Sequence, residues 1–402
     1  MKGLGADMST TATSLIQCTS ELQDFCTNIA FDPDSPPFIA VDTEFMRERT
    51  YYPILCLIQV ADAKQAVAID PLAPGLDLSP FFELLFRSDI LKVFHAGRQD
   101  LEIFNHLTGN LPTPIFDTQL AAMVCGFGEA ASYESLVKGI LKKSIDKTSR
   151  FSDWSSRPLR KEQLTYALAD VIHLRPLYRW FMKALNKNQR YEWLDKEMVT
   201  LLTPQTYTPD PSVLWKRIKS RQVQSLNPQS LGLLKKLSMW REEMAIAKNL
   251  PRRHVIKDDL LVELAILKPT ETEDLNRLRD PRGKEALTGL PMDRLFEMVQ
   301  QVQHNPMPKA KEPERLHLSA QEAILLELLK IVLKHCAQKH NVAAKLLATT
   351  QDLERLVREA HPDIDALKGW RFELFGKEAL AFKAGEKAFA FTNGKLTLCP
   401  LG

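Results

Sequence analysis

Residues 38–45 read Phe-Ile-Ala-Val-Asp-Thr-Glu-Phe and contain the clearest structural signal in the chain. The apolar residues are rich in strand formers and follow Pro36 and Pro37, so we predict a buried strand here. Side chains two positions apart on a strand point to the same face. Asp42 and Glu44 are therefore expected to lie side by side where a hydrophobic strand ends.

Two carboxylates this close repel each other, and burying them costs free energy unless a positive charge lies between them. A divalent cation meets this requirement, and hard oxygen ligands favour Mg²⁺ or Mn²⁺. The alternative is a solvated strand end that carries two ordinary surface acids. This stretch alone leaves both interpretations open.

The composition is that of an ordinary globular protein of two to four domains, with 402 residues, 45% hydrophobic and 26% charged. The net charge of +3 does not by itself indicate a nucleic-acid binder. Six scattered cysteines without a Cys-X-X-Cys pair predict reduced thiols and a cytoplasmic location. We find no secretory signal and no apolar run long enough to span a membrane, so no membrane association is expected.

Other acidic residues follow further predicted strands. Residues 53–60 and 66–69 are expected to extend the first strand into an antiparallel meander. Residues 91–94 form the next predicted strand, which leads through Asp100 into a helix over residues 101–107. Ligand sites in α/β sheets tend to collect at the carboxyl ends of strands, so Asp100 is a candidate for the same site as Asp42.

The next segment contains a predicted strand at residues 112–116 and a predicted helix over residues 133–141. Between them, Asp117 is interpreted as the N-cap of a helix in preference to a metal ligand. A later helix, Lys161–Trp180, places Tyr166 and Asp170 four residues apart on one face. Taken singly, these two residues are an ordinary half-buried aromatic and a solvated or paired acid, and His95 is interpreted as structural.

Taken together, these acids carry a family resemblance. Asp-Thr-Glu-Phe at residues 42–45, His-Ala-Gly-Arg-Gln-Asp-Leu at 95–101 and Tyr-Ala-Leu-Ala-Asp at 166–170 resemble the three exonuclease motifs of the DEDD superfamily. The tyrosine four residues before the last aspartate is similar to its DEDDy branch, and Ser-Asp-Trp at 152–154 resembles the ribonuclease D family. The resemblance implies an α/β ribonuclease H-like exonuclease domain, a mixed sheet flanked by helices, over residues 1–203.

The resemblance also implies the chemistry. Asp42, Glu44, Asp100 and Asp170 would be both catalytic residues and the ligands of two divalent ions, Mg²⁺ or Mn²⁺, which can clamp the attacking and leaving oxygens of a phosphodiester. Tyr166 would orient the attacking water, since its ordinary pKa near 10 disfavours simple base catalysis. The expected activity is 3′-5′ exoribonuclease trimming of structured RNA, tRNA precursors in particular, with release of 5′-mononucleotides.

The C-terminal half changes character after a linker rich in proline and threonine at residues 203–211. Residues 215–257 contain eleven basic and two acidic residues, which indicates a surface for a phosphate backbone, although solvated helix faces are the alternative. The candidate nucleic-acid-binding residues here and near the third motif are Lys147, Arg150, Arg157, Arg241, Lys248, Arg252 and Arg253.

Two helical regions, residues 212–304 and 314–402, each resemble an HRDC module, with a second linker at residues 305–313. At the places that correspond to Trp240-Arg241 and Pro251 of the first region, the second has no Trp-Arg pair and no proline, and we interpret it as a divergent module used for packing. The resemblance implies RNA 3′ ends as partners, and no obligate protein partner is evident. A DNA 3′-5′ exonuclease and a catalytically weak RNA-binding protein are the alternatives, since metal chemistry is blind to the 2′-hydroxyl.

Overall fold

The computed structural model describes residues 14–33, 35–146, 148–149, 151–208, 210–278, 291–304 and 318–401. Its N-terminal unit is built on a six-stranded mixed sheet with the strand order β1-β4-β3-β2-β5-β6. The strands are β1 (Ser14–Ile16), β2 (Phe38–Met46), β3 (Ile54–Ala61), β4 (Ala66–Ile69), β5 (Leu91–Phe94) and β6 (Ile115–Asp117). The predicted sheet and the antiparallel meander β2-β3-β4 are confirmed.

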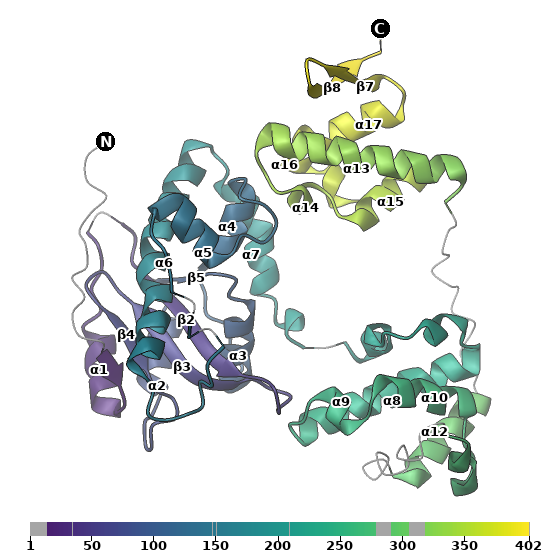
Figure 1. Cartoon of the computed structure of the whole chain (residues 1–402), viewed down its shortest axis with the longest axis horizontal. Coiled ribbons are helices and arrows are strands. Elements are labelled where there is room, and N and C mark those ends of the chain that lie inside the picture. Colours follow the sequence, from purple (N-terminus) through teal and green to yellow (C-terminus); the bar gives the residue numbers. More distant parts are fainter. Residues whose placement is uncertain are drawn as a thin grey trace.

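Helices cover both faces of this sheet (Figure 1). The longest helix of the unit, α6 (Lys161–Lys187), lies across β2, β3 and β4 on one face. On the other face lie α1 (Thr19–Thr27), α2 (Ser79–Phe86) and α3 (Arg98–Thr108), which share a hydrophobic core with the sheet. The sheet is thus the middle layer of three.

The alternation of side chains along β2 determines where its acids lie. Phe38 and Ala40 join the core beneath α6, whereas Ile39 and Val41 join the core on the side of α1, α2 and α3. Because side chains alternate between the faces of a strand, Asp42 and Glu44 continue the row that faces α6. They follow this apolar row in the second half of the strand, which continues to Met46 and does not end before the acids as we predicted.

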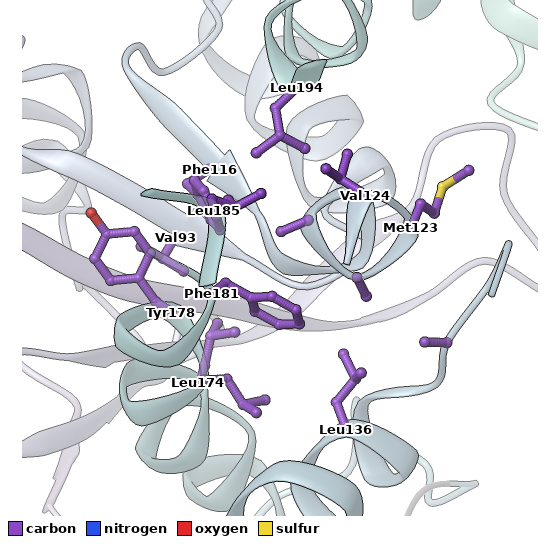
Figure 2. Packing of buried hydrophobic residues seen from close by; sticks show 14 of the residues in the cluster. Val93, Phe116, Met123, Val124, Leu136, Leu174, Tyr178, Phe181, Leu185 and Leu194 are labelled. Atoms are coloured by element: carbon purple, nitrogen blue, oxygen red, sulfur yellow. The ribbon is translucent and has the colours of Figure 1, made fainter. Parts of the chain in front are cut away.

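The core beneath α6 holds this helix to the sheet. Figure 2 shows Leu174, Phe181 and Leu185 of α6 directed toward side chains from the sheet and from α4 (Thr118–Val124). Phe181 and Leu185 are completely buried. This packing fixes the helix that carries Tyr166 and Asp170 against the strand that carries Asp42.

Some predicted boundaries were wrong. The strand predicted at residues 112–116 begins only at Ile115, because Pro112 and Pro114 have no N–H group to donate to the ladder. The helix predicted over residues 101–107 begins at Arg98, so that Asp100 lies in its first turn. The helix predicted over 133–141 is α5 (Tyr133–Leu136) followed by a π-helical segment, Val137–Leu141.

The C-terminal half contains two separate hydrophobic cores. The first is formed around α8 (Pro228–Ala247), α9 (Arg252–Val255), α10 (Asp258–Leu267) and α12 (Met292–His304). The second is formed around α13 (Ala320–His340), α14 (Ala344–Leu347), α15 (Thr350–Arg358), α16 (Gly369–Arg371) and α17 (Lys377–Lys383). The predicted second linker, residues 305–313, lies outside the described residues. The all-helical architecture that we predicted is confirmed for the first region, whereas the second is helical only up to α17 and ends in two strands.

A β-hairpin that the sequence analysis did not predict follows α17. It pairs β7 (Lys387–Thr392) with β8 (Lys395–Pro400) in antiparallel register. The intervening Asn393 and Gly394 have positive φ angles of 52° and 73°, which suits the Asn-Gly turn that such hairpins favour.

Both helical regions contact the exonuclease unit. The side-chain oxygen of Asn249 accepts hydrogen bonds from the backbone N–H groups of Tyr51 and Tyr52 in the turn after β2, both at 3.1 Å. The second region stacks Trp370 on Trp193, with ring centroids 4.5 Å apart and an interplanar angle of 9°. Within the described residues, no helix is long and apolar enough to cross a membrane.

Lys92 provides a test of the sheet. Its ammonium group is fully buried and donates to the carbonyl oxygens of Arg87, Ile90 and Thr113, each at 2.8 Å. We expect Lys92→Met to lower the free energy of unfolding by about 1–3 kcal/mol, because buried acceptors lose their donor. Urea denaturation measures this, with the exposed Lys64→Met as the control. A loss no larger than that of the control would contradict the structural role of Lys92.

Candidate active site

Three elements bring the predicted acids together at one edge of the sheet. Asp42 and Glu44 lie in β2 beyond the residues that pair with β5, Asp100 lies in the first turn of α3, and Asp170 lies on α6. Burial raises the pKa of Asp42 well above its ordinary value, and repulsion from Asp100, Asp170 and Glu44 raises it further. The four carboxylates are therefore close enough to interact electrostatically.

Asp100 is held by Thr43, whose side chain lies on the face of β2 opposite that of Asp42 and Glu44. Only 5% of this residue is exposed, and burial raises the pKa of Asp100 to about 6. The hydroxyl group of Thr43 donates a hydrogen bond to the Asp100 carboxylate, which partly offsets this rise in pKa. Thr43 is thus a residue of the site that our sequence analysis passed over, although it lies between two of the predicted ligands.

A second tyrosine approaches the site from α5. The hydroxyl group of Tyr133 donates to the backbone carbonyls of Ala169, at 3.1 Å, and of Asp170. Burial raises the pKa of Tyr133, as do the nearby charges of Asp170 and Asp42. The sequence offered no signal for this residue, because its local pattern indicates only the start of a helix and the fold alone brings it to α6.

A cavity of about 430 Å³ opens beside the acids. Asp42, Tyr166 and Asp170 line it together with a set of residues from the loops and from α4 and α5, which includes His95, Gln119, Ser132, Tyr133 and Glu134. The predicted tyrosine and two of the predicted acids therefore face one hollow. Glu44 and Asp100 are not among the residues that line this cavity, and their charges act on Asp42, which does line it.

His95 has a position that our structural interpretation did not anticipate. Its Nδ1 atom lies 3.0 Å from the hydroxyl oxygen of Thr118, and its ring lies 5.4 Å from that of Tyr133. Burial lowers the pKa of His95, which favours the neutral imidazole. The residue is therefore anchored in the protein and also forms part of the cavity wall.

Asp117 is the N-cap of α4, as predicted. Its carboxylate accepts a hydrogen bond from the backbone N–H of Gln119 at 2.7 Å. The same carboxylate accepts from the N–H groups of Ala96 and Gly97, at 3.1 and 2.8 Å. It therefore also fixes the turn that leads into α3 and Asp100.

The donor set suits a hard divalent cation. Among the residues that the structure describes, no three carboxylate, imidazole or thiol groups are arranged so that they could hold a metal ion. The mutual repulsion that raises the pKa of Asp42 is nevertheless the electrostatic condition that a bound cation relieves. Carboxylate oxygens are preferred by Mg²⁺ and Mn²⁺, so the residues present fit such an ion.

The predicted nucleic-acid-binding residues lie in different environments. Lys147 and Arg150 lie outside the described residues. Arg157 donates to Asp70 at 2.6 Å and to the backbone oxygens of Cys56 and Trp154, so its guanidinium is engaged within the protein. In the first helical region, Arg241 and Arg252 form ion pairs with Asp258 and Glu242, whereas Lys248 and Arg253 are exposed.

Comparisons with known proteins agree with this architecture. A family model for a 3′-5′ exonuclease matches residues 13–186, and a model for an HRDC domain matches residues 230–286. Ribonuclease D of Nitrobacter hamburgensis is 42% identical over 95% of this chain and 98% of its own length. Ribonuclease D of Zymomonas mobilis is 44% identical over 90% of this chain and 92% of its own.

A solved structure matches nearly the whole chain. The crystal structure of Escherichia coli RNase D, an exoribonuclease involved in structured RNA processing, superposes with a TM-score of 0.76 and 27% identity. The match covers 93% of this chain and 99% of the other.

The mixed sheet, the converging acids and these matches define a 3′-5′ exonuclease of ribonuclease H-like fold that carries an HRDC domain. More particularly, the chain belongs to the ribonuclease D family and is a 3′-5′ exoribonuclease. Enzymes of this exonuclease family depend on divalent metal ions.

Asp42→Asn tests the role of the acid whose pKa is raised by the other three carboxylates. A neutral amide is a poorer cation ligand, and changes to outer partners of a metal site alone cost about 10- to 100-fold. We therefore expect turnover of labelled RNA with Mn²⁺ to fall at least ~100-fold. Retention of a substantial fraction of wild-type turnover would reject the assignment of Asp42 to the site.

Asp42→Asn should lower turnover, but without metal it should make the folded protein less sensitive to rising pH. Because burial and repulsion raise the pKa of Asp42 in the folded state, the wild-type protein should lose stability as the pH rises above the ordinary aspartate value of 3.8. Asp42→Asn should lose less, since it has no charge to bury. Thermal unfolding in chelator across this pH range gives the measurement, and identical pH profiles would contradict the electrostatic account.

Proposed function

We propose that this protein trims the 3′ ends of structured RNA, tRNA precursors in particular, with two Mg²⁺ or Mn²⁺ ions held by Asp42, Glu44, Asp100 and Asp170. The observation that carries the proposal is that repulsion from the carboxylates of Asp100, Asp170 and Glu44 raises the pKa of Asp42. The similarity to RNase D of Escherichia coli, described as acting in structured RNA processing, supports the substrate class.

Bound ions would supply charge neutralisation for the phosphate and a water of lowered pKa. The protein itself provides the geometry. Thr43 holds Asp100, and Tyr133 holds the backbone at Asp170, so that carboxylates from two helices face the end of β2. Tyr166 lies one turn before Asp170 on the same helix and lines the same cavity, where its hydroxyl can orient the attacking water.

The cavity beside the acids supports removal of one nucleotide at a time. Its volume of about 430 Å³ suits a single nucleoside, and its polar wall residues His95, Gln119 and Ser132 can hydrogen-bond to the sugar or base. Ile145 and Leu174 add apolar surface to the lining. We place the terminal nucleoside in this cavity, with its 5′ phosphate toward Asp42.

The first helical region offers a candidate surface for the RNA backbone. Lys248 is exposed next to Asn249, whose side chain binds the turn between β2 and β3. Arg253 is also exposed and lies 3.7 Å from Asp258 at the start of α10. We assign the phosphate contact to these two residues because their side chains are exposed, 74% in the case of Arg253, whereas Arg157, Arg241 and Arg252 are more buried in their ion pairs.

We further propose three domains, over residues 1–203, 212–304 and 314–402, which the separate hydrophobic cores support. The third would be a divergent HRDC module that packs on the first domain through the pair of Trp193 and Trp370. A cytoplasmic location is supported by the absence of disulfides among the six cysteines, all of which are described and free. We propose no obligate protein partner.

The direct test uses 5′-labelled tRNA precursors with Mn²⁺, because a label at the 5′ end stays on the RNA while the 3′ end is shortened. The proposal expects stepwise loss of 3′ nucleotides, and no shortening of any RNA would favour a binding protein without catalysis. Matched RNA and DNA oligomers separate the remaining alternative. Equal or faster degradation of the DNA would make a DNA exonuclease the better assignment.

Tyr166→Phe tests how the water is oriented. The change keeps the ring and removes only the hydroxyl, so turnover should fall by about 100- to 10,000-fold with little change in RNA affinity or thermal stability. Tyr178→Phe, a buried tyrosine on the same helix, serves as the matched control and should keep its activity. Wild-type turnover in Tyr166→Phe would reduce that residue to part of the packing.

Charge removal in the first helical region tests RNA binding. We expect the double variant Lys248→Ala/Arg253→Ala to bind RNA more weakly, with a dependence of log affinity on log salt concentration that is less steep by about 1 to 2. The control is Lys183→Ala/Lys187→Ala, which removes two exposed charges at the end of α6. Equal salt slopes in both double variants would show that this surface does not touch phosphate.

A further inference from the structure

A buried glutamine in the middle of the sheet has no hydrogen-bond partner. Gln59 of β3 is completely inaccessible to solvent. Among the described residues, neither its side-chain nitrogen nor its side-chain oxygen has a hydrogen-bond partner. A buried amide without partners is destabilising, and an apolar side chain of the same size would fill this position at lower cost.

The register of the sheet places Gln59 directly beside Asp42. The two residues are Cα partners in the antiparallel pair of β2 and β3, so their side chains share a face with Cβ atoms about 4.5–5.5 Å apart. That separation is within reach of a hydrogen bond between an amide and a carboxylate after a change of rotamer.

The other neighbours of Gln59 on this face are apolar. Leu57 and Ala61 precede and follow it on the same side of β3, and Ala68 is its partner on β4. These three belong to the hydrophobic clusters that contain Ala167 and Val171 of α6. The polar group directly opposite Gln59 is therefore the Asp42 carboxylate. Glu44 lies two residues further along β2, opposite Leu57.

We propose that Gln59 is a positioning residue whose amide NH₂ donates a hydrogen bond to the Asp42 carboxylate when the divalent cation is bound. A neutral donor stabilises the charged carboxylate without competing for the cation. It occupies one carboxylate oxygen and leaves the other directed toward the ion, as outer partners of metal ligands do. The inference rests on the proposed metal-dependent hydrolysis.

Gln59→Met tests the inference because it should weaken the response to Mn²⁺ without lowering metal-free stability. Methionine keeps a similar volume and removes the unpaired amide, so the metal-free melting temperature should stay the same or rise. The Mn²⁺ concentration for half-maximal activity should rise by about 10- to 100-fold, and the Mn²⁺-induced rise in melting temperature should shrink accordingly. RNA affinity in chelator should not change.

The matched control is Val60→Ala, the neighbouring residue whose side chain lies in the core on the other face of the sheet. It should lower the melting temperature and leave the Mn²⁺ dependence unchanged. A Gln59→Met variant with wild-type Mn²⁺ dependence would overturn the inference, as would one in which Mn²⁺ dependence changes only in proportion to lost stability.

A crystal structure of the wild-type protein with Mg²⁺ gives a test that does not depend on a variant. The inference requires the side-chain nitrogen of Gln59 within hydrogen-bond distance of an Asp42 carboxylate oxygen, and an amide that remains unpaired overturns it. The proposed function fails in a different way, because the wild-type protein itself would then show no Mn²⁺-dependent RNA degradation.

Discussion

The mutual repulsion of four neighbouring carboxylates is the constraint on which this structure depends. Asp42 follows the apolar first half of β2, and burial and three neighbouring acids all raise its pKa. Hydrophobic packing of α6 on the sheet, seen in Figure 2, holds these charges together against their repulsion. A site built in this way is destabilising without a cation, and binding of a cation converts the same arrangement into a favourable one.

Contacts near the acids hold them in place, and contacts further away hold the elements that carry them. Thr43 and Tyr133 hold Asp100 and the α6 backbone, while Asp117 caps α4 and fixes the turn before α3. Further out, the helical region around α8 binds the turn between β2 and β3 through Asn249. The stacked pair of Trp193 and Trp370 joins the exonuclease unit to the last helical region. The helical regions thus attach to the exonuclease unit at two separate places (Figure 1).

Local patterns predicted much of this architecture. The period-2 alternation around Asp42 and the helical spacing of Tyr166 and Asp170 each determine a face, so the acids could be identified before the fold was known. Tyr133 and Gln59 could not be identified in this way, because their positions depend on contacts between elements far apart in the chain. Arg157 and Arg252 show a related difficulty, since sequence gives a charge but not the buried acid that pairs with it.

The account depends most on the claim that the four acids hold divalent cations, and crystals containing Mn²⁺ test this claim most directly. Anomalous scattering from manganese identifies each bound ion independently of the protein model. The account predicts anomalous peaks between Asp42, Glu44, Asp100 and Asp170 at the mouth of the cavity. Fully occupied manganese sites elsewhere, with no peak among these carboxylates, would contradict it.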